Sequence, residues 1–390
     1  MLEFTYKLNK RFLFMNNTAL KLSNRGAILE LLLTKKATSR SELARMSGLT
    51  KMTISNIVAE LISNEIIQEV SSASKGNHGR PTGSLSLSIK APKILAIHLG
   101  SPSSFVVLID LMGNVIKKEA FAVDCANQEA FLETVYVPVD KVVRESINER
   151  MLCISVSTDF PLSKGGESII PFEAGTIPFK EVVSKRYGLP VFIATKPICA
   201  LLAEQYFGSS QDSKNAVYIQ IHQQILSAAT IDRKPIVNPN GGGIKIEHIS
   251  IDYNGLSCTC GGRGCLQSYI SIDSMEKKLR DITKLKTDFK GFCEIQSKKN
   301  DSRIDWALKD MMDKLGFALK SVANIIAQDT VIIGGLGTAL PDRYLAKLEK
   351  YLSTENGTIV VKKEDISEER SALNAACPAL MEVLSGNLVL

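Results

Sequence analysis

The chain has 390 residues, of which 45% are hydrophobic and 23% charged, and its formal net charge is +6 at pH 7. This length suits two or three domains, and the composition excludes a disordered chain. No apolar run approaches the roughly 18–20 residues that cross a bilayer. The first twenty residues lack the features of a signal peptide, so we expect a cytoplasmic protein with no membrane partner.

The excess positive charge lies in the first quarter of the chain. Residues 1–90 hold 13 Lys and Arg against 6 Asp and Glu, whereas the remaining residues hold 34 against 35. A basic module on a near-neutral body is typical of a protein that binds a polyanion. A solvated basic surface with no ligand would give the same count.

Three helices are predicted within residues 1–90. The first runs from about Asn24 to Lys35-Lys36. The second opens at Ser39-Arg40-Ser41-Glu42, a capping box in which the serine and glutamate side chains bond each other's backbone N–H groups. After the glycine turn at Gly48, Thr50 caps a third helix. Its apolar residues follow the spacing of one helix face and are Ile54, Ile57, Val58, Leu61 and Ile62.

Two helices joined by a short glycine turn form the helix-turn-helix arrangement, whose second helix enters the major groove of DNA. The residues away from the apolar face are short donors and acceptors with one cation, which suits phosphates and base edges. An ordinary exposed helix face is the alternative. The DNA-binding residues predicted in these helices are Ser39, Arg40, Thr50, Lys51, Thr53, Ser55 and Asn56.

A hairpin is predicted after the third helix. Two strand-like stretches, 66–72 and 84–89, flank a loop of small residues that carries Lys75 and Arg80. A hairpin after a recognition helix is a wing, and a cation at its tip can enter a narrow minor groove. We therefore add Lys75 and Arg80 to the predicted DNA contacts, with a flexible basic linker as the alternative.

The chain after residue 92 alternates strand-like and helical patterns, which indicates an α/β fold. The predicted strands are 94–99, 104–109, 152–157, 191–193, 216–221 and 331–333, and the clearest helices are 200–206 and 311–326.

The sharpest motif of the chain is a cysteine cluster. Cys258, Cys260 and Cys265 follow His248 within eighteen residues. Three thiolates and one imidazole complete a tetrahedral zinc site with no open position, which is structural rather than catalytic. Glycines between the cysteines let the backbone fold around the metal. Three ordinary free thiols are the alternative interpretation.

This cluster, together with the Gly-Arg-Pro sequence at 79–81 and the order of the two parts, resembles the ROK family of repressors, open reading frames and kinases. More narrowly, it resembles that family's bacterial DNA-binding regulators of xylose and N-acetylglucosamine genes. The resemblance covers the chain after about residue 20. It implies an actin-like ATPase fold with two lobes around a cleft, a dimer or tetramer, and sugar binding that alters affinity for operator DNA.

The resemblance also shows which kinase positions have changed. Family kinases carry an aspartate where His98 stands and a glycine-rich phosphate loop, whose counterpart at 222–228 has no glycine. Their catalytic aspartate corresponds to Lys196, and a protonated lysine cannot accept a proton from a sugar hydroxyl. The turn at 334–337 resembles the family's adenosine-side turn and is interpreted as preserving the fold. We therefore expect no enzyme activity and no bound ATP.

The family's sugar-binding positions carry an unusual set of residues here. The resemblance assigns them to Thr195, Lys196, Lys245, His248 and Gln267. Two carboxylates of the family have become lysines, and two cations that face one cleft favour an anionic ligand such as a sugar phosphate, sugar acid or uronate. A neutral sugar, or no ligand at all, remains the alternative.

These observations predict the organisation of the whole chain. Residues 1–90 form a winged helix-turn-helix, 91–195 a first α/β lobe completed by the helix at about 370–390, and 196–369 a second lobe with the zinc site and an oligomerisation surface. We expect a repressor of carbohydrate-utilisation genes that binds double-stranded operator DNA as a homodimer or homotetramer and senses a small carbohydrate-derived effector. A regulator with no small-molecule ligand and a carbohydrate kinase are the alternatives.

Overall fold

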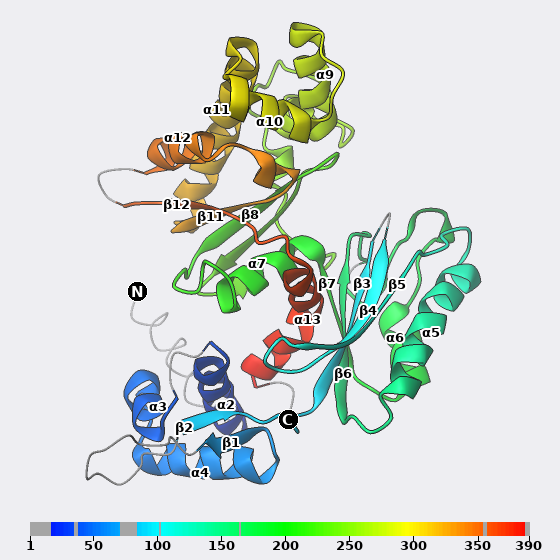
Figure 1. Ribbon diagram of the computed structural model, residues 1–390, viewed down its shortest axis with the longest axis vertical. Coiled ribbons are helices and arrows are strands. Elements are labelled where there is room, and N and C mark those ends of the chain that lie inside the picture. The colour runs from blue at the N-terminus through cyan, green and yellow to red at the C-terminus, as the bar shows by residue number, and fades with distance from the viewer. Residues whose placement is uncertain are drawn as a thin grey trace, which may run out of the picture. The chain divides into compact units, whose positions relative to one another are not determined.

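The computed structural model describes residues 17–34, 38–70, 84–100, 103–163, 165–353 and 357–386. The chain divides into two compact units (Figure 1). Unit 1 comprises Met1–Ser157, Lys180–Ile193 and Ala375–Leu390, and unit 2 comprises Thr158–Phe179 and Ala194–Asn374. Neither unit is therefore a continuous stretch of sequence.

Unit 1 begins with a small bundle of helices and a two-stranded sheet. Its elements are α2 (Asn17–Leu33), α3 (Arg40–Ser47), α4 (Lys51–Ser63), β1 (Ile67–Val70) and β2 (Ser84–Leu87). The two strands pair antiparallel. The apolar stripe predicted on the third helix is buried at Ile54, Ile57, Val58 and Leu61, so the amphipathic pattern forms the core of this bundle.

The rest of unit 1 is built on a five-stranded sheet. Its strands are β3 (Lys93–Leu99), β4 (Ser104–Ile109), β5 (Val115–Phe121), β6 (Met151–Thr158) and β7 (Val191–Thr195). They lie in the order β5-β4-β3-β6-β7, and the first three are antiparallel neighbours. The helices of this part are α5 (Gln128–Glu145), which packs on β4 and β5, α6 (Phe179–Tyr187), and α13 (Glu368–Leu384), which begins in unit 2 and continues in unit 1.

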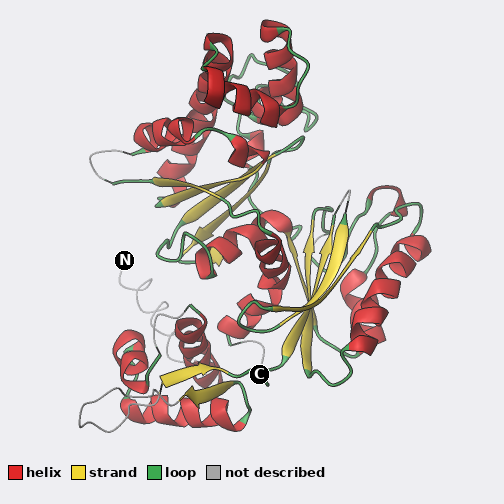
Figure 2. Cartoon of the chain, in the orientation of Figure 1, coloured by secondary structure: helices red, strands yellow, loops and turns green. Residues whose placement is uncertain are grey.

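Unit 2 carries the second five-stranded sheet, and Figure 2 shows both sheets with helices beside them. Its strands are β8 (Ala216–Ile221), β9 (Leu226–Ile231), β10 (Lys234–Pro235), β11 (Thr330–Gly335) and β12 (Val360–Lys363). The order is β10-β9-β8-β11-β12, with β8, β11 and β12 parallel to one another. The carboxyl ends of these three strands therefore meet at one edge of the sheet.

Helices and short turns complete unit 2. They are α7 (Lys196–Tyr206), α8 (Gln267–Ile270), α9 (Ile272–Thr283), α10 (Phe289–Lys299), α11 (Ser302–Ile326) and α12 (Asp342–Leu352), with the short turns η1 (Phe172–Ala174), η2 (Ile246–His248) and η3 (Leu336–Ala339). The buried face of α11, including Leu308, Met311 and Leu315, joins the strand residues Val217 and Ile333 in one hydrophobic core.

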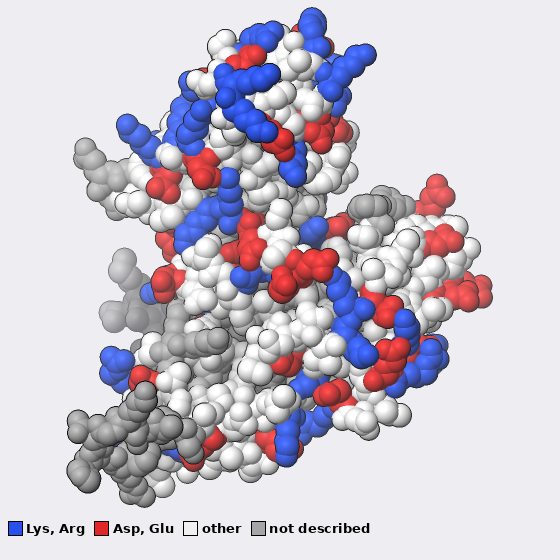
Figure 3. Space-filling model, viewed as in Figure 1, with Lys and Arg blue, Asp and Glu red and all other residues white. Residues whose placement is uncertain are grey.

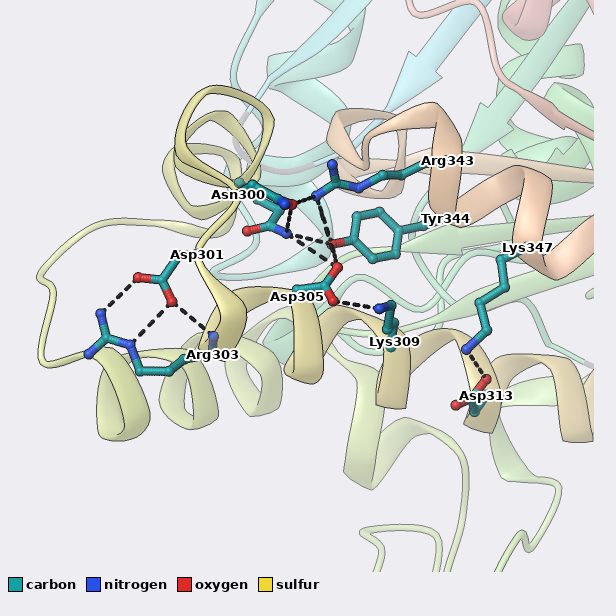
Figure 4. Close-up of polar contacts among 10 residues, drawn as sticks. Asn300, Asp301, Arg303, Asp305, Lys309, Asp313, Arg343, Tyr344 and Lys347 are labelled. Atoms are coloured by element: carbon teal, nitrogen blue, oxygen red, sulfur yellow. Dashed lines mark hydrogen bonds and ion pairs between the residues drawn. The ribbon is translucent and has the colours of Figure 1, made fainter.

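Polar contacts join α10, α11 and α12 above that core (Figure 4). The hydroxyl of Tyr344 donates to the Asp305 carboxylate at 2.8 Å, and the Gln296 amide donates to the same hydroxyl at 2.9 Å. Figure 3 shows Lys and Arg gathered over this part of unit 2 with Asp and Glu among them. Pairs such as Lys347–Asp313, at 2.8 Å, make this surface mixed in charge rather than a basic patch.

The observed elements confirm the predicted α/β fold and correct several boundaries. The strands predicted after residue 92 all fall within observed ones, and β4 and β8 match them residue for residue. In the hairpin, β1 begins at Ile67 rather than at residue 66, and β2 ends at Leu87 rather than at residue 89. The first helix, however, begins at Asn17 rather than near Asn24. Its early turns have no strong apolar spacing. They are held instead by the end of the chain, since Gly26 packs against the Leu384 carbonyl and Gly386 against Leu22. Among the described helices, none is long and apolar enough to cross a membrane.

Candidate nucleic-acid interface, metal centre and ligand site

Local capping fixes both helices of the predicted DNA-reading motif. The Ser39 hydroxyl accepts from the Glu42 N–H at 3.3 Å, and the Glu42 carboxylate accepts from the Ser39 N–H at 3.1 Å. These hydrogen bonds lower the pKa of Glu42, with the Thr38 N–H the largest contributor. Gly48 ends α3 at φ +71°, a conformation that glycine adopts without strain. Thr50 then caps α4 by accepting from the Thr53 N–H at 3.2 Å.

The first turns of α4 expose polar side chains in the order that the sequence predicts. Lys51, Ser55 and Asn56 are exposed, whereas Thr53 is half-buried and its hydroxyl forms a hydrogen bond with that of Thr50 at 2.9 Å. One exposed residue was missed by the sequence analysis. Met52 is 75% exposed beside Lys51, and an apolar side chain at the start of a recognition helix can contact thymine methyl groups.

Three of the predicted DNA contacts differ from the others. The Arg40 guanidinium forms an ion pair with Glu69 of β1, so this cation links α3 to the hairpin. Lys75 and Arg80 lie outside the described residues. Among the described residues, the exposed polar side chains of this motif therefore lie on α4 and at the start of α3.

The four predicted metal ligands converge in unit 2. One ligand atom from each of His248, Cys258, Cys260 and Cys265 lies within 4.8 Å of the others. Cys258 Sγ is 3.6 Å from His248 Nδ1, and Cys260 Sγ is 3.6 Å from Cys265 Sγ. A tetrahedral ion with metal–sulfur bonds of about 2.3 Å separates its ligands by roughly 3.7 Å. The described side chains thus form a closed four-ligand set that could hold a metal ion.

Glycines shape the loop that carries the cysteines. Gly264 has φ +68°, and a Cβ there would overlap with the Asp252 carbonyl, so only glycine fits. Gly261 has φ +89° and no atom within 4 Å of an added Cβ, so glycine is favoured there only by the backbone conformation. The Cys260 N–H lowers the pKa of Cys258, whereas desolvation and the neighbouring cysteines raise the pKa of Cys265.

A buried hydrogen-bond cluster positions His248. The Ser227 hydroxyl on β9 donates to the Glu247 carboxylate at 2.7 Å and accepts from the Ile246 N–H at 3.0 Å. Glu247 is only 6% exposed, and its removal from water raises its pKa. Because Glu247 precedes His248, this cluster ties the imidazole to the central sheet. Ser227 lies in the predicted counterpart of the phosphate loop at 222–228, but neither it nor Glu247 was predicted to contact another residue of the site.

Lys196, one of the predicted effector contacts, has an internal counter-ion. Thr195 is the N-cap of α7, but its buried hydroxyl has no hydrogen-bond partner among the described residues. Lys196 is the first residue of that helix, where a positive charge opposes the helix dipole. The Asp159 carboxylate lies 3.8 Å from its Nζ, with side chains 26% and 32% exposed respectively. Asp159 offsets the unfavourable charge and was not anticipated from sequence.

The remaining effector candidates surround the metal loop. Lys245 is exposed at the start of η2 and has no ion pair among the described residues. The Gln267 side-chain oxygen accepts from the Ile225 N–H at 3.3 Å, which joins the loop to the 222–228 turn. Desolvation lowers the pKa of His222 in that turn, and the charge of Lys196 lowers it further.

Comparison with known proteins identifies a family relationship over most of the chain. The model of the ROK family matches residues 94–381. The xylose repressor of Caldicellulosiruptor bescii is 24% identical over 362 residues, which cover 87% of this chain and 89% of that protein. The transcriptional dual regulator NagC of Escherichia coli is 21% identical over 401 residues, 96% of each chain.

Solved structures agree on the fold. A ROK family transcriptional regulator described as a homologue of the E. coli Mlc protein superposes with a TM-score of 0.79 at 21% identity, covering 95% of this chain and 98% of that one. A ROK hexokinase from Thermus thermophilus has a TM-score of 0.65 at 20% identity, covering 75% of this chain and 99% of its own. The regulator thus matches nearly the whole length, and the hexokinase three quarters.

Proposed function

The chain belongs to the ROK family, and on that premise we propose that it is a DNA-binding transcriptional regulator, acting as a repressor of carbohydrate-utilisation genes. The capped α3–α4 pair, followed by the β1–β2 hairpin, carries this proposal. The start of α4 presents a cation, short polar groups and a methionine in one exposed turn, which suits phosphate and base-edge contacts. Lys75 and Arg80 would add contacts from the wing.

We propose zinc as the metal of the closed Cys-Cys-Cys-His set. Soft thiolate ligands in tetrahedral geometry select this ion, and four protein ligands leave no position for a substrate. The metal would hold the segment between His248 and Gln267 in place. It would supply no chemical step.

The effector site would lie between the start of α7 and the metal loop. The proposed contacts are Thr195, Lys196, Lys245, His248 and Gln267, and the proposed ligand is a small carbohydrate-derived molecule with a negative charge. Lys245, which has no ion pair among the described residues, supports the anionic class. An effector alters DNA binding only if it binds two conformations with different affinity.

The same site supports a non-enzymatic function. Lys196 stands where the family's kinases place their catalytic aspartate, and the Asp159 carboxylate is its counter-ion at 3.8 Å. A protonated amine cannot act as the base for a sugar hydroxyl.

A regulator without a small-molecule ligand is the second candidate. The Lys196–Asp159 pair favours it, because one of the two cations already has an internal partner. In either case we propose a homodimer or homotetramer whose two-fold symmetry matches an inverted-repeat operator.

The decisive experiment is capture of genomic DNA fragments by the full chain at near-physiological salt. Nonspecific binding weakens steeply with salt, whereas base-specific binding persists. We expect a few fragments that share an inverted repeat. Asn56→Ala should weaken binding to the selected repeat by roughly 1–3 kcal/mol if Asn56 reads a base. Ser63→Ala, on the same helix but at its far end, should leave binding unchanged.

The captured fragments then test the effector. Sugar phosphates and uronates should release the DNA if the ligand is anionic, and neutral sugars should release it if the charge is incidental. DNA that no metabolite releases would support the ligand-free regulator. Absence of any enriched repeat would contradict DNA recognition by α4.

A further inference from the structure

The glycine turn after β11 in unit 2 receives a side-chain carboxylate. Gly335 has φ +61° and precedes η3, and its N–H donates to Glu364 Oε2 at 3.2 Å. Glu364 directly follows β12, and its own N–H donates to the Ile333 carbonyl at 3.0 Å. The parallel pairing of β11 and β12 therefore delivers the carboxylate to the turn.

A buried tyrosine holds the same carboxylate oxygen. Tyr218 of β8 is 0% exposed, and its hydroxyl donates to Glu364 Oε2 at 2.8 Å. The oxygen lies so close to the chain that a Cβ at Gly334 would overlap with both the tyrosine hydroxyl and the carboxylate. This is the approach that bare glycine backbone permits to phosphate oxygens in anion-binding turns.

The neighbouring side chains leave little room for a further anion at this turn. The Gln220 side chain packs on the other side, where its Cγ would lie 3.0 Å from a Cβ at Gly335. Removal from water raises the pKa of Glu364, and the Tyr218 hydroxyl, the Gly335 N–H and the Lys196 charge oppose that rise. The acceptor oxygen that a bound phosphate would bring to the turn is thus already present within the chain.

We propose that Glu364 is an internal substitute for a phosphate group, which occupies the anion-binding N–H of Gly335 and closes this turn to nucleotide. The inference deepens the proposed non-enzymatic function and rests on it, because the turn resembles the adenosine-side turn of the family's kinases. A nucleotide is the group that the fold implies here, and the residues present do not fit it. Instead, the hydrogen bonds from Tyr218 and Gly335 to Glu364 join β8, β11 and the end of β12 at the carboxyl edge of the sheet without a ligand.

Thermal unfolding of the full chain without DNA tests this proposal. The probes are ATP with magnesium, inorganic phosphate and acetate at constant ionic strength, each against chloride. The wild-type Tm should not respond to ATP. Any rise with phosphate or acetate that comes from the proposed effector site should be the same in wild type and in Glu364→Ala, so only the additional rise in the variant reports on the turn. Glu364→Ala should lower Tm by roughly 5 °C, because it removes the acceptor of two hydrogen bonds. Phosphate or acetate should then raise the Tm of this variant in a concentration-dependent way.

Two further variants make the result specific. Glu364→Gln keeps an acceptor oxygen for Tyr218 and Gly335, so it should stay folded and respond to anions no more than the wild type does. The Glu349 carboxylate of α12 accepts from the Val361 N–H of β12 at 2.8 Å. Glu349→Ala therefore removes a comparable contact to β12 away from the turn, and the Tm of this variant should likewise respond to anions no more than that of the wild type. If Glu364→Ala is unfolded, its refolding yield should recover in phosphate but not in chloride.

Three results would overturn the proposal. The first is an increase in Tm with ATP that is as large in the wild type as in Glu364→Ala. The second is binding of ATP by Glu364→Gln. The third is an increase in the Tm of Glu364→Ala with phosphate or acetate that is no larger than the increase for Glu349→Ala. Because these measurements use protein without DNA, their failure is distinct from a failure of operator recognition.

Discussion

The Asp329 carboxylate is held mainly by a distant segment of unit 2, with one further hydrogen bond from the adjacent Thr330 hydroxyl at 2.8 Å. The carboxylate accepts from the Ser213 hydroxyl at 2.5 Å and from the N–H groups of Lys214 and Asn215 at 2.9 and 3.0 Å. Burial alone would raise its pKa, but these hydrogen bonds lower it overall. The carboxylate therefore joins the starts of β8 and β11, which pair in the centre of the sheet.

Asp329→Asn should lower the free energy of unfolding by about 1.5–3 kcal/mol at pH 7, the range for hydrogen bonds to a charged group. A carboxyl whose pKa is lower in the folded state contributes stability above its unfolded pKa, and this is lost as pH falls through the folded pKa. The difference between wild type and variant should therefore shrink below about pH 4. Urea unfolding of both proteins at pH 7, 5 and 3 measures this difference in the free energy of unfolding.

Asp313→Asn is the matched control for this prediction. Asp313 is exposed and pairs with Lys347 at the surface of α11, so its replacement should change stability by less than about 1 kcal/mol. A wild-type minus Asp329→Asn difference that stays constant from pH 7 to pH 3 would contradict the proposed role of the charge.

At the scale of elements, capping of α4 is separable from DNA contact. Thr50→Ala removes the acceptor for the Thr53 N–H and should cost about 1 kcal/mol of local helix stability. Thr50→Asn keeps the cap, because asparagine is an equally good N-cap residue. Amide hydrogen exchange over the first turn of α4 should be faster in the alanine variant and near normal in the asparagine variant.

Operator affinity of the two variants then gives the role of Thr50. If the threonine acts through the helix, Thr50→Asn should bind the selected DNA nearly as well as wild type, and Thr50→Ala more weakly. Equal losses in both variants would show that the hydroxyl or methyl group contacts DNA itself.

At the scale of the whole molecule, the four residues that could hold a metal ion belong to a loop that contacts several other segments. The loop from His248 to Cys265 leads directly into Gln267, which bonds the 222–228 turn, while Glu247 bonds β9. Removal of the metal should free this loop and disturb both sides of the proposed effector site. A structural metal contributes directly to folding energy, so the effect should extend to stability.

We expect one zinc per chain by elemental analysis, and chelation should make the segment 249–266 sensitive to protease. Cys258→Ser should reproduce this loss of metal and protection. Cys125→Ser, at a half-buried cysteine outside the ligand set, should not. A fully protected loop in metal-free protein would show that hydrogen bonds alone hold it.

Much of the fold was predictable because its signals are local. The capping box at Ser39 and Glu42, the turn at Gly48 and the apolar spacing from Ile54 to Leu61 involve residues within a few positions of one another. The metal ligands were predictable for a related reason, since the types and spacing of Cys258, Cys260 and Cys265 leave few other interpretations. The predicted effector residues remain a prediction.

The sequence by itself therefore determined the α/β class, the helix-turn-helix pattern and the metal-ligand set. Only the tertiary structure decided where α2 begins, which carboxylate faces Lys196, and that Glu364 fills the turn at Gly335. Each of these depends on segments far apart in the chain, as the separation of 146 residues between Tyr218 and Glu364 illustrates. Helix caps and periodicities act over one or two turns, whereas a buried charge finds its partner only after distant strands have paired.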